Sequence, residues 1–207
     1  MTIFSYITRF YRYGFIITLA LVSFQGCVNI KASLPAYSYY TLESTETQGY
    51  NHTTFSTIAL ELEVLPYLNT QRIMRISPQA KAQALTTTKW ITLPSLLLQN
   101  TLESNARMQG VILSTLGAHP IKLHIKVRKL AIYEESKQAI VALDYTLLQG
   151  QSISRVRTLL SVENVQNSSE QAMINALQSA LDSAAKKIQN ALCDDTKLCT
   201  SPKATPH

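Results

Sequence analysis

The feature that most constrains the fold is a stretch of about forty residues, 121–162, in which hydrophobicity follows the two-residue period of a β-strand. Over 121–128 apolar and polar residues alternate strictly, which predicts a strand with one buried face. The phase then shifts by one residue, which predicts a β-bulge at Arg128–Lys129. The predicted inward residues are Ile121, Leu123, Ile125 and Val127, and the predicted outward residues are Lys122, His124, Lys126 and Arg128.

The same stretch continues as a hairpin. Residues 139–148 are apolar on both faces except at Asp144, which predicts a central strand that is covered on both sides. Gly150 and its two glutamine neighbours mark a turn into a return strand over 152–162. In this return strand Val156, Leu160 and Val162 share one face, and Arg155 and Arg157 take the other.

The rest of the chain predicts short strands and two helices. Strand-forming residues cluster at 37–42, 58–64, 72–76 and 111–116. A leucine-rich helix is expected from Pro94 to about Met108, and a long helix from Glu170 to Leu192. The long helix carries one apolar stripe at helical spacing, which favours packing on a sheet. The expected fold is α+β, with a single mostly antiparallel sheet of about six strands and two main helices packed on one face.

The N-terminus has the parts of a bacterial export signal. Residues 1–14 contain Arg9 and Arg12 and no acidic residue, and an apolar run follows over 15–24. This run is shorter than the roughly 20 residues of a membrane-spanning helix, although an uncleaved anchor is the alternative. Cys27 directly follows and resembles the lipidation site of a lipoprotein. We therefore expect a lipoprotein signal peptide over 1–26 and a lipidated tether over 27–36.

Two further cysteines, Cys193 and Cys199, lie close together near the C-terminus. If Cys27 carries lipid, an even remainder in an exported protein predicts a disulfide. A metal site is the alternative, but two cysteines without a nearby histidine lack ligands. The polar segment 194–207 is expected to be a flexible tail.

No catalytic arrangement emerges from the sequence. The chain has no GxSxG elbow, no glycine-rich phosphate loop and no HExxH motif. Its four histidines lack a second ligand at metal-binding spacing, so we expect no metal and no cofactor. The carboxylate pairs Glu61/Glu63 and Glu134/Glu135 fit a solvent face and a turn better than acid–base catalysis.

The basic residues allow two interpretations. The net charge is +6, and the scarcity of charged residues, 15%, argues against disorder. If strands 121–128 and 152–162 were neighbours, their cations would share one outer face. That face would be either solvated or a surface for anionic lipid or an acidic protein. No motif supports nucleic-acid binding. The cations concerned are Lys122, Lys126, Arg128, Arg155 and Arg157.

The order of several short motifs resembles a known family, the ABC-type transport auxiliary lipoproteins, which include the paraquat-inducible protein C (PqiC) and YmbA group. The motifs are an opening Tyr-Tyr-Thr-Leu strand at 39–42, a Pro-Tyr-Leu segment at 66–68 followed by Arg72, and Lys89-Trp90 before a leucine-rich helix. The hairpin and the alanine-rich final helix complete the match. The resemblance places this family's domain at 37–193.

The resemblance implies a non-catalytic lipoprotein on the periplasmic face of the outer membrane. Its implied partners are an MCE-domain protein that spans the periplasm and, through it, an inner-membrane ABC permease for lipid transport. Alternatives are an assembly lipoprotein that partners a β-barrel, or a hydrolase with an unrecognised site. A homo-oligomer remains open. The candidate partner surface combines the basic residues above with Leu65, Pro66, Tyr67, Leu68 and Trp90, each of which is either interface or core.

Overall fold

A computed structural model describes residues 36–41 and 55–199 of the chain. These described residues belong to one compact unit. The expected signal peptide, Cys27 and the end of the expected tail lie outside the described residues. No helix in the described ranges is long and apolar enough to cross a bilayer.

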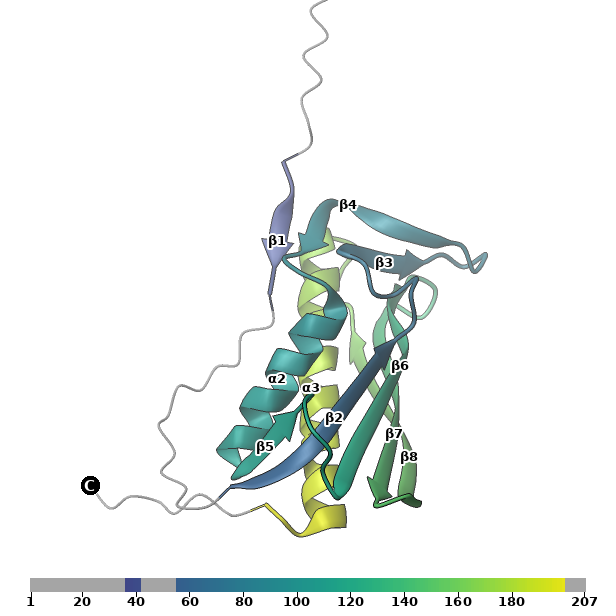
Figure 1. Ribbon diagram of the computed structural model, residues 1–207. Coiled ribbons are helices and arrows are strands. Elements are labelled where there is room, and N and C mark those ends of the chain that lie inside the picture. Colours follow the sequence, from purple (N-terminus) through teal and green to yellow (C-terminus); the bar gives the residue numbers. More distant parts are fainter. Residues whose placement is uncertain (1–35, 42–54, 200–207) are drawn as a thin grey trace, which may run out of the picture. The chain divides into compact units, whose positions relative to one another are not determined.

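Eight strands form one sheet on which two helices pack (Figure 1). The sheet is mixed. The strand β6 pairs antiparallel with β7 along one side, and its other side is shared by β2 and β3, both parallel to it. The strands are β1 (Ser38–Tyr40), β2 (Ser56–Val64), β3 (Arg72–Ile76), β4 (Ala82–Trp90), β5 (Val111–Ser114), β6 (Ile121–Tyr133), β7 (Gln138–Gln149) and β8 (Ser152–Asn164).

The α+β class is confirmed. The expectation of about six mostly antiparallel strands was wrong, because the sheet of the described chain has eight strands and mixed pairing. One missed strand is β4, whose Thr-rich sequence has only three buried side chains, Leu85, Thr88 and Trp90. The other error concerns direction. Hydrophobic alternation identifies strands but not their partners, and β1–β4, β2–β5, β2–β6 and β3–β6 all pair in parallel.

The predicted hairpin is present. The register between β6 and β7 shifts between Val127 and Lys129, which confirms the expected bulge. Gly150 has φ +63° in the turn between β7 and β8, a conformation that glycine adopts without strain. The strand β7 lies between β6 and β8, so its predicted central position is confirmed. The expectation that it is covered on both sides was wrong, because both helices pack on one face and Ile140, Thr146 and Leu148 on the other face are only half-buried.

Both helices cover one face of the sheet. α2 (Pro94–Met108) packs on β2, β5 and α3, and α3 (Glu170–Thr196) packs mainly on β7 and β8. The whole predicted stripe of α3 is buried, which confirms that it packs on the sheet. The opposite face of the sheet carries no helix of the described chain. The stripe consists of Met173, Leu177, Leu181, Ala184, Ile188 and Leu192.

Candidate functional site: the uncovered sheet face and its edge

No constellation in the described ranges offers evident catalytic chemistry. No group of three or more His, Cys, Asp or Glu residues there could hold a metal ion. A pocket of about 440 Å³ beside the loop after β8 contains Arg75 and Glu134, but these two pair with each other at 3.0 Å. Burial raises the pKa of Tyr133, which also lines this pocket, so its hydroxyl stays protonated at neutral pH. The charged groups that line the pocket are thus the Arg75–Glu134 ion pair and Lys137, beside the phenol of Tyr133.

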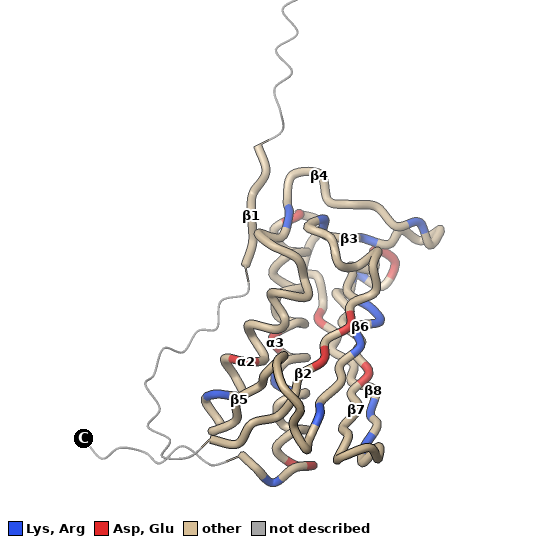
Figure 2. Tube along the Cα trace, viewed as in Figure 1, with Lys and Arg blue, Asp and Glu red and all other residues tan. Residues whose placement is uncertain are grey.

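On the uncovered face, cations and carboxylates from β2, β6 and β7 alternate and neutralise each other (Figure 2). Lys122 pairs with Glu61, and the hydrogen bond from its ammonium lowers the pKa of that carboxyl. Lys126 lies 2.7 Å from Glu63. Because carboxylates neutralise these cations, the arrangement favours a solvated face over a free positive patch. Each exposed pair of this kind contributes only about 0–1 kcal/mol to stability.

The remaining predicted cations divide between two faces. Arg128 of β6 reaches Asp144 of β7 at 3.2 Å on the uncovered face. The expectation that Arg155 and Arg157 share this face was wrong, because β7 separates β8 from β6 and Arg157 pairs in register with the buried Tyr145. Both arginines lie on the side of the sheet that α3 covers.

There the two arginines neutralise a carboxylate at the end of α3. Arg157 donates from Nε to Asp195 at 3.2 Å, and Arg155 lies 3.7 Å from the same side chain, which is only 4% exposed. A carboxylate near a helix C-terminus faces the negative end of the helix dipole, so it requires such counter-charges. Burial and the Asp195 carboxylate together raise the pKa of Tyr145.

Because the arginines of β8 point toward α3, its apolar side chains point away from the helices and form an exposed stripe. Ile153, Val156, Leu160 and Val162 lie on the uncovered face and are 65%, 64%, 52% and 39% exposed. The alternating pattern places three of them on one face but does not predict its exposure, since a period of two identifies two faces without saying which is covered. We call these four residues the β8 stripe.

The β8 stripe also borders a sheet edge. In the described chain β8 pairs only with β7, so its other side carries no strand. Lys187 of α3 donates to the Leu160 carbonyl at 2.6 Å and occupies an acceptor on that free side. Natural proteins use lysines in this way against uncontrolled edge pairing. The side chains of the stripe, more than the strand backbone, are therefore available to a partner.

The Pro-Tyr-Leu segment and the tryptophan separate into exposed and core residues. Leu68 is 5% exposed and Trp90 is 1% exposed, so both belong to the core. Tyr67 is 61% exposed and Pro66 is also exposed, whereas Leu65 is half-buried. In this segment only Pro66 and Tyr67 can present most of their surface to a partner.

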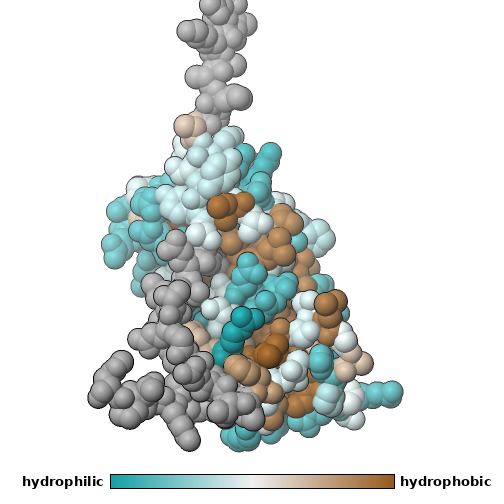
Figure 3. All heavy atoms as spheres, turned by 60° about the vertical axis from the view of Figure 1, so that its left-hand side comes forward, coloured by the Kyte–Doolittle hydropathy of each residue, from teal (hydrophilic) through white to brown (hydrophobic). Residues whose placement is uncertain are grey.

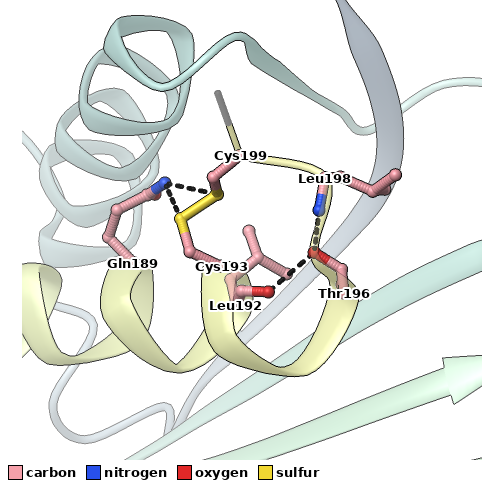
Figure 4. Close-up of a disulfide and its surroundings, with 6 residues drawn as sticks. All are labelled: Gln189, Leu192, Cys193, Thr196, Leu198 and Cys199. Atoms are coloured by element: carbon pink, nitrogen blue, oxygen red, sulfur yellow. Dashed lines mark hydrogen bonds between the residues drawn. A yellow bond between two sulfur atoms is a disulfide. The ribbon is translucent and has the colours of Figure 1, made fainter. Parts of the chain in front are cut away.

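Cys193 and Cys199 form a disulfide at the end of α3 (Figure 4). Gln189 points its amide at both sulfur atoms, with Nε2 3.4 Å from the Sγ of Cys193 and 3.8 Å from that of Cys199. The backbone N–H of Lys197 donates to the Cys193 carbonyl and closes the helix. Asp195 lies inside the disulfide loop, so the loop also orients the carboxylate that binds Arg157.

Replacing both cysteines with serine should lower the free energy of unfolding by about 2 kcal/mol, because the short loop places the disulfide at the low end of the usual range. Urea denaturation of the purified protein measures this. Wild-type protein in excess reductant is the control and should match the double variant. Equal stability of the oxidised wild type and the double variant would contradict the prediction.

Two solved structures share this α+β fold. A crystal structure of an uncharacterized protein aligns with a TM-score of 0.61 and 15% identity, over 76% of this chain and 99% of its own. Protein XCC0632 from Xanthomonas campestris aligns with a TM-score of 0.66 and 15% identity, over 77% of this chain and 97% of its own. At this identity the likeness defines the fold alone.

The family follows from the sequence match. The family described as the ABC-type transport auxiliary lipoprotein component matches residues 40–189. The chain therefore belongs to this family, which confirms the resemblance of its motifs. No curated protein is significantly similar to this chain.

Proposed function

We propose that this protein is a non-catalytic outer-membrane lipoprotein that serves an MCE-type ABC system for lipid transport between membranes. In this role Cys27 carries the lipid anchor, and the domain holds the far end of the periplasm-spanning MCE protein at the outer membrane. Several acyl chains on one cysteine hold a soluble domain stably on a bilayer, which a single chain does not.

The observation that carries this proposal is the family match, which covers most of the folded domain. The structure supports a binding role through the β8 stripe, a row of apolar side chains in solvent on an otherwise charge-neutralised face. Contiguous exposed apolar surface typically marks a site of protein or membrane contact. We place the contact with the MCE protein on this stripe.

A pull-down from detergent-solubilised membranes, followed by mass spectrometry, tests the function. We expect the full-length protein to recover an MCE-domain protein together with its permease. The Cys27→Ser variant is the control for anchoring and should be lost from the membrane fraction. Recovery of a β-barrel protein instead would favour the alternative role in outer-membrane assembly, and recovery of neither would contradict both.

The docking surface is tested by Val156→Lys together with Leu160→Lys. Charges in the centre of an interface typically weaken binding strongly, so we expect at least a roughly tenfold loss of captured MCE protein. Thermal stability should hardly change, because both side chains are exposed. Leu116→Lys, at a position that is 79% exposed outside the stripe, is the matched control.

Unchanged capture by the stable double variant would refute the β8 stripe as the docking site and leave the family role intact. Sedimentation of the same variant distinguishes a further case. If the wild type forms a homo-oligomer that the double variant does not form, and capture is unchanged, the stripe binds a second copy of this chain.

A further inference from the structure

A second exposed surface lies at the end of the domain where the described chain begins. There β1 pairs with β4, and the Ile91 N–H donates to the Tyr40 carbonyl at 2.9 Å. The side chain of Gln71 also donates to the Ile91 carbonyl. Figure 1 shows β1, β3 and β4 together at this end, with α2 and α3 beginning nearby.

Aromatic and aliphatic side chains are exposed at this end. Figure 3 shows brown hydrophobic surface below the pale surface at the top of the domain. The aromatic members are tyrosines, whose amphipathic rings favour the boundary between water and lipid. We call the following residues the tyrosine end: Tyr37, Tyr39, Tyr67, Ile91, Leu93 and Leu96, which are 37%, 57%, 61%, 54%, 38% and 46% exposed.

The cations beside the tyrosine end are not neutralised by acids. Arg72 and Lys89 are register partners on β3 and β4, and within the described ranges neither makes an ion pair with a carboxylate. Lys89 instead lies 3.5 Å from the centroid of the Tyr37 ring. This contrasts with the predicted cations of β6 and β8, which pair with carboxylates. Arg72 and Lys89, beside the exposed tyrosines, are therefore available to an anionic surface.

The chain between the anchor and this end is short. Eight residues lie between Cys27 and Ala36, so even a fully extended chain spans only about 30 Å from one to the other. A lipid on Cys27 therefore keeps the first described residues within this distance of the bilayer. This tether is short enough to let Arg72 and Lys89 reach anionic headgroups at the bilayer surface.

We infer that the tyrosine end, with Arg72 and Lys89, rests against the anionic phospholipid surface of the membrane that holds Cys27. This inference relies on the proposed function through the acylation of Cys27. The tyrosine rings and Ile91 enter the interface, and the two cations contact headgroup phosphates. The β8 stripe is left for the protein partner.

Fluorescence of the lipidated protein in vesicles tests the inference. Since Cys27 would be acylated and Cys193 and Cys199 bonded to each other, an introduced cysteine is the single free thiol for an environment-sensitive dye. We compare Tyr67→Cys and Ile91→Cys with Ile153→Cys on the β8 stripe as the matched exposed control. The vesicles contain phosphatidylethanolamine with phosphatidylglycerol, or phosphatidylcholine alone.

We expect quenching by brominated lipids to be at least about twofold stronger at positions 67 and 91 than at 153 in phosphatidylglycerol vesicles. Adding Arg72→Gln and Lys89→Gln, or high salt, should reduce the quenching to its level in phosphatidylcholine. Equal weak quenching at all three positions would overturn the inference and leave the proposed function standing. Dyes that respond only after an MCE protein is added would also overturn it.

The mass of the N-terminal peptide separates the two proposals. An acylated Cys27 with weak quenching refutes only the contact of the tyrosine end with lipid. An unacylated Cys27 refutes the anchor on which both proposals rely.

Discussion

Replacing Trp90 with alanine is expected to lower the free energy of unfolding by about 3–5 kcal/mol, the usual cost of removing a large aromatic side chain from a core. Trp90 is 1% exposed at the end of β4, and its backbone N–H donates to the Gln71 carbonyl at 2.8 Å. The truncation leaves a cavity in the core beneath the tyrosine end. Urea denaturation measures the loss, and Trp90→Phe should lose less because it leaves a smaller void.

The control is the next residue, Ile91, which is 54% exposed. Ile91→Ala should change the free energy of unfolding by less than about 0.5 kcal/mol. A loss below about 1 kcal/mol for Trp90→Ala would contradict the core assignment and restore Trp90 as an interface residue. In the Lys-Trp motif before α2, Trp90 thus packs in the core, and Lys89 on the other side of β4 contacts the Tyr37 ring.

The second large effect concerns Glu170, the first residue of α3. Its carboxylate accepts hydrogen bonds from three consecutive threonines of β4, including the backbone N–H and hydroxyl of Thr86, both at 2.9 Å, and the Thr88 hydroxyl at 3.0 Å. A negative charge at this position also faces the positive end of the helix dipole. The contact joins two elements that are more than eighty residues apart in sequence.

We expect Glu170→Ala to lower the free energy of unfolding by about 2–3 kcal/mol, because several hydrogen bonds to a charged group are lost together. Asp182→Ala is the matched control on the same helix. Asp182 pairs with Lys186 at 2.9 Å, and its side chain is 51% exposed, so it should contribute less than about 0.5 kcal/mol. Equal effects of the two substitutions in urea denaturation would refute the role assigned to Glu170.

The contribution of Glu170 should depend on pH. Burial raises the pKa of the carboxyl, but the hydrogen bonds from Thr87, Thr86 and Thr88 outweigh burial and lower the pKa from 4.5 to about 2. A depressed pKa stabilises the folded state fully above about pH 4.5 and progressively less as the pH falls toward 2. The stability difference between wild type and Glu170→Ala should therefore shrink over this range, and a constant difference would contradict the assignment.

The two proposed contacts use different parts of the domain. The tyrosine end includes Tyr37 and Tyr39, which come soon after Cys27 in the sequence, whereas the β8 stripe lies on the uncovered face of the sheet. Substitutions at Tyr67 and Ile91 should therefore affect lipid contact, and those at Val156 and Leu160 should affect capture of the MCE protein. A variant at one site that impaired both activities in a stable protein would contradict this separation.

Local patterns in the sequence were sufficient to predict the strands, the turn and the helix of the domain's second half. Strict alternation over 121–128, the bulge after Val127 and the turn at Gly150 all depend on side-chain periodicity and backbone sterics, which are local. The stripe of α3 was predictable for the same reason. The nearness of Cys193 and Cys199 in sequence, together with the inferred export, was enough to predict their disulfide.

Which faces of the strands are exposed depends on the tertiary structure and could not be predicted from the sequence. Alternation in β8 defines two faces, but the covered face depends on where α3 lies. On that covered side Arg155 and Arg157 pair with Asp195 at the end of α3. Likewise, nothing local in Lys122 or Lys126 shows that Glu61 and Glu63 lie within reach on the neighbouring parallel strand. Strand partners and unpaired charges depend on contacts between distant segments, and these determine where a partner or a lipid surface can bind.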